Sequence, residues 1–139
     1  MNARVRAFTL IELIAVIIVL AILSGIAIPR YIDASTRARE AAAKHTLGTV
    51  RSAIATFYNN GAINGAPAWP TLAQMQTFGA TGVLKEPLPV NPYNHSSAIR
   101  AATWSAMPPV GGPEGYAYDP TTGKFWLNST TAGVNEHLW

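Results

Sequence analysis

The chain has 139 residues, contains no cysteine and carries a formal net charge of +3 at pH 7. This length suggests one domain, and the lack of cysteine excludes disulfides, thiolate metal sites and cysteine nucleophiles. The basic residues gather in the first part of the chain, and the charges beyond Gly61 nearly balance. No basic patch with interleaved aromatic residues is present, so nucleic-acid binding is not predicted.

Residues 1–7 contain two arginines and no acidic residue, directly before an apolar run. Positive charge on this flank predicts that the N-terminus stays in the cytoplasm and that the C-terminal part is exported. The run flows into Pro29 without a clear small-x-small cleavage site, which disfavours an ordinary secretory signal.

The apolar run from Phe8 to Ile28 carries one charged residue, Glu12. A helix of this length is about 30 Å long, enough to cross the hydrocarbon core of a bilayer. A carboxylate there costs about 2.5–3.5 kcal/mol near the bilayer centre and less near an end. We therefore expect Glu12 to have a partner. The alternative is that Glu12 lies near the membrane interface and reaches the headgroups.

The segment from Ala7 to Leu13, with the sequence A-F-T-L-I-E-L, is followed by an aliphatic run and Pro29. It resembles the cleavage and methylation motif of type IV pilins and of the pseudopilins of type II secretion systems. The resemblance covers about residues 4–31 and is closest to a major pseudopilin. It implies cleavage between Ala7 and Phe8 by a membrane-embedded prepilin peptidase, and methylation of the new Phe8 amine. The family usually has Gly before the cut; Ala7 is the smallest substitute, so we expect processing.

Cleavage would create an α-amine at Phe8, four residues before Glu12. In a staggered filament, the ammonium of one subunit can lie against the carboxylate of the next. In a low-dielectric surround this attraction offsets much of the desolvation cost and favours one register. Glu12 is therefore predicted to have a role in assembly.

The end of the apolar run predicts a hinge. The ring of Pro29 would clash with the carbonyl of Gly25 and free it from its helical hydrogen bond. Because related filaments lose helicity here on assembly, the segment from Gly25 to Pro29 is the predicted hinge. The simpler interpretation is a kink that marks the membrane exit.

Beyond Tyr31, an amphipathic helix is predicted to continue to about Asn59 and to end in the turn residues up to Gly61. Its apolar stripe should pack on the sheet of the same subunit, although it could also receive a partner helix. The stripe consists of Leu47, Val50, Ile54 and Phe57.

The remaining residues form the head. Thr71 can cap a short helix from Leu72 to Phe78, and residues 85–113 should be mostly loop with one short strand. Aromatic residues in 116–118 and 124–127 flank a turn that ends in Gly123, which predicts a β-hairpin.

No catalytic constellation is present, and we predict that the chain is not an enzyme. Calcium is the one metal whose binding must be considered, because major pseudopilins commonly bind it through carboxylates and carbonyls in two loops of the head. This chain has residues 91–94 and 128–133 at those places, without an aspartate in either. A hard cation requires carboxylates among its oxygen ligands, so no metal ligand and no cofactor is predicted.

The resemblance implies the α+β fold of type IV pilin-like proteins, a long N-terminal helix packed on a small antiparallel sheet. Residues 1–7 would be the cleaved leader, and 8–28 the transmembrane and filament-core half of the helix. Residues 29–60 would continue the helix into the head. Residues 61–139 would form a small globular head with a short helix and a C-terminal hairpin.

The main functional prediction is a structural subunit of a bacterial type II secretion pseudopilus. The subunit would be stored in the inner membrane, processed, N-methylated and assembled into a helical filament, periplasmic or on the cell surface, that supports protein export. Its predicted partners are other copies of itself, minor pilin-like subunits, the prepilin peptidase and an inner-membrane assembly platform. A small head without cysteine favours this over a type IV pilus pilin, which would serve adhesion, motility or DNA uptake.

The rival from another class is a monomeric, single-pass, membrane-anchored protein whose head binds a ligand. Its binding face would be lined by tryptophans, although these side chains would also suit a small core. They are Trp69, Trp104, Trp126 and Trp139.

Overall fold

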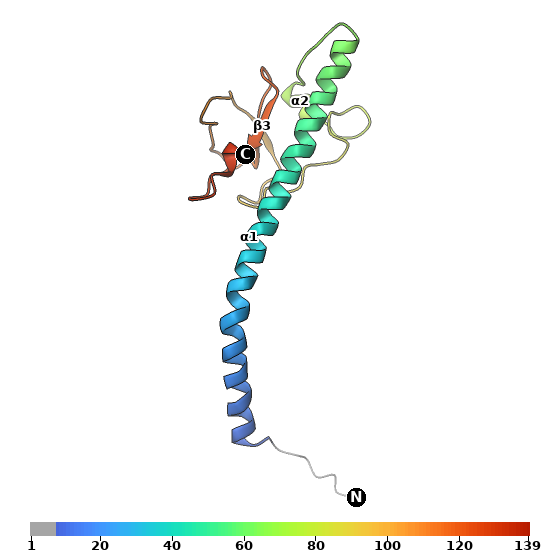
Figure 1. The fold of residues 1–139 in the computed structure, drawn as a ribbon. Coiled ribbons are helices and arrows are strands. Elements are labelled where there is room, and N and C mark those ends of the chain that lie inside the picture. Colours follow the sequence, from blue (N-terminus) through green and yellow to red (C-terminus); the bar gives the residue numbers. More distant parts are fainter. Residues whose placement is uncertain (1–7) are drawn as a thin grey trace, which may run out of the picture. The chain divides into compact units, whose positions relative to one another are not determined.

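A computed structural model describes residues 8–139, and it has one long helix, a short helix, three strands and a 3-10 turn (Figure 1). The chain divides into two compact units, the first ending at Ala38 and the second comprising Arg39–Trp139. Helix α1, Leu10–Ile63, contributes to both. The fold class is α+β, as predicted.

In the first unit, the residues of α1 leave nearly all of their side chains exposed. Among the described residues, α1 is the one helix that is long and apolar enough to cross a bilayer, and none of its most apolar window is buried within the chain. Such a contiguous apolar surface is not stable in water, so it needs lipid or other protein around it.

In the second unit, the predicted stripe on α1 packs against the sheet. Leu47, Val50 and Ile54 are buried, and Ala43 extends the same face toward the N-terminus. Phe57 was expected in this core, but it is only half-buried. One turn beyond Ile54, it lines a groove beside the sheet instead.

Helix α1 ends later than its turn residues suggested. Gly61 still lies inside the helix, and the chain turns at Gly65, whose φ of 75° is left-handed. The amide of Ala66 donates to the carbonyl of Gly61 at 2.9 Å, and that of Gly65 donates to Ala62 at 3.1 Å. These two bonds are a Schellman motif, which satisfies the last carbonyls of the helix.

Helix α2, Leu72–Met75, begins where the sequence predicted. Thr71 and Gln74 form a capping box, in which each side chain accepts a hydrogen bond from the other's backbone amide. The helix is shorter than predicted because Phe78 forms an isolated parallel bridge with Leu84 instead of a further turn.

The sheet consists of β1 (Ile99–Ala101), β2 (Tyr116–Asp119) and β3 (Lys124–Leu127), in the order β1-β2-β3. The predicted hairpin is β2 and β3, which pair antiparallel with Tyr116 opposite Leu127. The expectation of a purely antiparallel sheet was wrong, because β1 pairs parallel to β2. A parallel pair needs a crossover of about a dozen residues, and residues 102–115 supply it.

The two faces of the sheet are covered by different parts of the chain. Tyr116, Tyr118 and Phe125 join the core that faces α1. Trp126 has the opposite parity in β3, and its indole nitrogen donates to the carbonyl of Pro109 in the crossover at 3.1 Å. Figure 1 shows the strands beside the second half of α1.

Asp119 is a buried carboxylate at the hairpin turn and is only 2% exposed. It accepts hydrogen bonds from the amide of Thr121 at 2.8 Å and from the amide of Trp104 at 2.9 Å. Burial alone would raise the pKa of Asp119, but these bonds and the Thr121 hydroxyl outweigh it and hold the pKa well below its ordinary value.

Acid should therefore destabilise the head through Asp119. A carboxyl whose pKa is depressed on folding contributes stability above its unfolded value, about 3.9, and that contribution is lost as the pH falls toward the folded value. We expect Asp119→Asn to lower the free energy of unfolding by about 1.5–3 kcal/mol at pH 7. Urea unfolding of the full chain in detergent at pH 7 and pH 3 would measure this. Equal acid-dependent losses in the variant and the wild type would contradict the assignment.

Candidate functional site

The start of α1 is built around Glu12. The amide of Thr9 donates to Glu12 Oε2 at 2.9 Å, and the Thr9 hydroxyl donates to the same oxygen at 2.9 Å. The amide of Glu12 donates to the Thr9 hydroxyl oxygen at 3.2 Å. This reciprocal pattern is a capping box with Thr9 at the N-cap and Glu12 at the third helical position.

The capping box gives the carboxylate hydrogen-bond donors within its own subunit. Glu12 was predicted as a functional residue and Thr9 was not, although the spacing T-x-x-E is the signature of this cap. The predicted partner of Glu12, the Phe8 amine of a second subunit, would have to compete with Thr9 or add to it.

The surroundings of Glu12 are apolar and open. Phe8, Ile11 and Leu13 are exposed, as are the aliphatic side chains that follow along α1. The predicted cut lies between Ala7 and Phe8, and Ala7 belongs to residues 1–7, which lie outside the described residues. The cleavage and the methylation of Phe8 therefore stay predictions.

At the predicted hinge, α1 is helical from Gly25 through Pro29 and beyond. A Cβ at Gly25 would meet nothing within 4 Å, so no packing within the chain requires glycine at this position. Pro29 lacks the amide hydrogen that would bond to the Gly25 carbonyl, which weakens the helix here without breaking it. A loss of helicity on assembly stays a prediction.

The tryptophans proposed for a binding face have different surroundings. Trp126 is fully buried, and Trp69 lies stacked on Tyr58 with ring centroids 4.1 Å apart. The hairpin turn covers part of the Trp69 indole. A Cβ added at Gly123 would lie 2.3 Å from the Trp69 ring. Trp69, Trp104 and Trp139 line one cleft, so three of the four tryptophans named for a binding face come together, without Trp126.

At the two places considered for calcium, the asparagines bond within the protein. Asn91 is fully buried and donates to the carbonyl of Gly115 at 2.8 Å. The side-chain oxygen of Asn128 accepts from Arg100 Nε at 3.0 Å and from the amide of Gly111 at 2.9 Å. Over residues 8–139 no group of three His, Cys, Asp or Glu side chains converges as a metal site would require.

Comparison with known proteins bears on the N-terminal segment. Residues 2–28 match the family described as the prokaryotic N-terminal methylation motif. The chain is 46% identical over 52 residues to the type IV narrow pilus major component PilA5 of Thermus thermophilus. This match covers 37% of the chain and 45% of that protein.

A second relative is the type IV major pilin protein PilA of Myxococcus xanthus, with 40% identity over 58 residues, 42% of the chain and 26% of that protein. The matches thus span less than half the length of either relative. No solved structure matches the chain. Together, the methylation motif, the two pilin relatives and the α+β fold support a type IV pilin-like protein.

Proposed function

We propose that this chain is a structural subunit of a type IV pilus-like filament. The observation that carries the proposal is a single carboxylate, Glu12, in the exposed apolar part of α1, where the N-terminal segment matches the methylation motif. The helix would be held in the inner membrane before assembly, with the head exported. In the filament, copies of the same helix would cover one another's apolar surface.

In this proposal, a prepilin peptidase cuts between Ala7 and Phe8, and the new amine of Phe8 is methylated. The ammonium then pairs with Glu12 of a neighbouring copy. Minor pilin-like subunits and an inner-membrane assembly platform complete the partners. The role is structural, not catalytic.

Mass spectrometry of the protein isolated from its own cells tests the processing. We expect a chain that begins at Phe8, lacks residues 1–7 and carries one added methyl group on its terminal amine. A chain that retains Met1 and never sediments as a polymer would overturn the proposal.

A type II secretion pseudopilus is the second candidate, favoured by the small head without cysteine. The two pilin relatives favour the pilus. Deleting the gene distinguishes the two: loss of surface filaments with normal protein export supports a pilus, and loss of export supports a pseudopilus.

A further inference from the structure

Beside β3 and the hairpin turn lies a cleft of about 420 Å³, which we call the aromatic cleft. Its walls combine indole rings with cations, and none of the described residues that line it has an acidic side chain; Arg51 also donates to the backbone oxygen of Trp139. The residues that matter most are Trp69, Trp104, Trp139, Arg51 and Lys124.

The two cationic side chains of the aromatic cleft, Arg51 and Lys124, differ in whether they already bond within the chain. Arg51 is half-buried, and its Nε donates to the carbonyl of Phe125 at 3.0 Å, so it is committed to holding α1 against β3. Lys124 is exposed, with Nζ 5.6 Å from the centroid of the Trp104 ring. The cleft is therefore suited to an apolar segment that brings a carboxylate to Lys124.

Residues 86–90, which we call the proline segment, have this chemistry on the same chain. Glu86, Pro87, Pro89 and Val90 are exposed, and over residues 8–139 Glu86 makes no ion pair. The two prolines and the restriction on the residue before each of them favour an extended polyproline II conformation. Such segments dock in aromatic-lined grooves at a low entropic cost.

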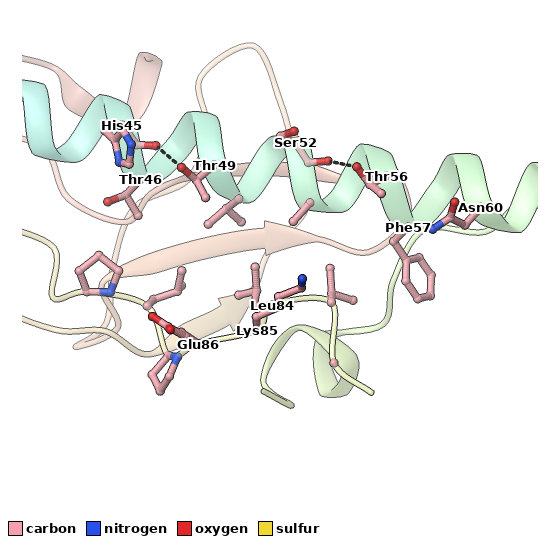
Figure 2. A pocket seen from close by; sticks show the side chains of 17 residues that line it. His45, Thr46, Thr49, Ser52, Thr56, Phe57, Asn60, Leu84, Lys85 and Glu86 are labelled. Carbon is pink, nitrogen blue, oxygen red and sulfur yellow. Dashed lines mark hydrogen bonds between the residues drawn. The ribbon is translucent and has the colours of Figure 1, made fainter. Parts of the chain in front are cut away.

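The proline segment is fixed to the rest of the head by two contacts. Leu88 is buried in the core, and the Tyr116 hydroxyl donates to the carbonyl of Pro89 at 2.9 Å. Because the segment is already fixed, little further order is lost when it binds. Figure 2 shows Glu86 across the groove from α1, on which Thr49 and Thr56 lie.

The aromatic cleft and the proline segment lie on opposite flanks of the second half of α1. Thr49 and Thr56 line the groove beside the proline segment, whereas Arg51 and Ala55 line the cleft. At about 100° per residue, the mean directions of these two pairs are about 130° apart around the helix. One head can therefore present its cleft to one neighbour and its proline segment to another.

We propose that the aromatic cleft of one copy binds the proline segment of the next copy, with Glu86 paired to Lys124. The contact joins two different surfaces of the same chain, so it is heterologous and repeats into an open polymer instead of closing as a dimer. This inference rests on the proposed function as a filament subunit. It adds a specific contact between the heads of neighbouring copies.

Reciprocal charge exchange tests the pairing in assembled filaments. Lys124→Glu and Glu86→Lys each place like charges together and should lower the sedimentable filament fraction about tenfold. The double variant, which restores opposite charges, should recover most of the loss. Arg39→Glu is the control: it changes the net charge as Lys124→Glu does, at an exposed position outside both the cleft and the proline segment, and should leave the yield unchanged.

Because the chain has no cysteine, crosslinking gives a second readout. Filaments of a Glu86→Cys, Lys124→Cys variant should form a ladder of dimers and larger multimers with a short bis-maleimide crosslinker, because the Cα atoms of a Lys–Glu pair lie farther apart than a disulfide can bridge. Glu86→Cys combined with Thr130→Cys, which lies outside the cleft, should not.

Normal filaments in both charge variants, with no ladder, would overturn the head contact and leave the filament itself intact. If the wild type never polymerises, the proposed function fails as well. Crosslinking of Lys124→Cys to a different protein, and not to Glu86→Cys of a second copy, would also overturn the proposal.

Discussion

Replacing Glu12 by alanine is expected to lower the fraction of subunits in filaments at least about tenfold, while the protein still inserts in the membrane. The carboxylate is the one charge on the apolar part of α1, and removing it makes insertion easier. A tenfold loss corresponds to about 1.4 kcal/mol, well within the range of an ion pair in an apolar surround. Sedimentation of sheared filaments, with the membrane fraction as the reference, measures both quantities.

Two matched variants separate the charge of Glu12 from its role in the helix cap. Glu12→Gln keeps an acceptor for the Thr9 amide but loses the charge, and it should assemble as poorly as Glu12→Ala. Thr9→Val keeps the charge and removes the hydroxyl that donates to it, so assembly should persist. Wild-type assembly of Glu12→Gln would show that the cap matters and that the ion pair does not.

Replacing Gly115 by alanine is expected to destabilise the head by about 3 kcal/mol or more. A Cβ at Gly115 would lie 1.8 Å from the carbonyl oxygen of Ser96, which is backbone and cannot turn aside. The amide of Gly115 donates to the carbonyl of Ala98, so the clash falls where β1 and β2 come together. Thermal unfolding of the full chain in detergent should show a transition at least about 12 °C lower.

Gly48→Ala is the matched control for Gly115→Ala. Gly48 lies inside α1, is exposed, and has nothing within 4 Å of an added Cβ. The same substitution should therefore stabilise the helix there by about 0.5–1 kcal/mol. A similar loss in both variants would mean that the close approach of Ser96 does not cause the effect.

The elements that could be predicted from the sequence are those set by local patterns. The apolar run around Glu12, the Thr71 cap and the hairpin across Gly123 all depend on residues close together in the chain. The stripe on α1 followed from helical spacing as far as Ile54. Phe57 keeps that spacing, but it lines a groove between α1 and residues 82–89 and is only half-buried. Helical spacing does not show where the covering segments end.

The features that were missed depend on contacts between distant segments. β1 is three residues long and pairs parallel with β2 across the crossover, and no local pattern gives the direction of such a pair. The tryptophans were named together as one face, but the sequence pattern did not separate the buried Trp126 from Trp69, Trp104 and Trp139, which meet in one cleft through the packing of separate loops. Thr9 is the exception, because the T-x-x-E spacing of its capping box is visible in the sequence. The apolar residues around it drew the interpretation toward a membrane helix instead.

The order of the core residues along the chain affects how the head folds during its synthesis. Leu47 and Ile54 of α1 are covered by Tyr116 and Phe125, which are synthesised more than 60 residues later. If the head crosses the membrane N-terminal part first, the ribosome and the translocon release α1 long before its covering strands emerge. During that interval the apolar stripe is open to chaperones and proteases, so the speed of translocation bears directly on the yield of folded heads.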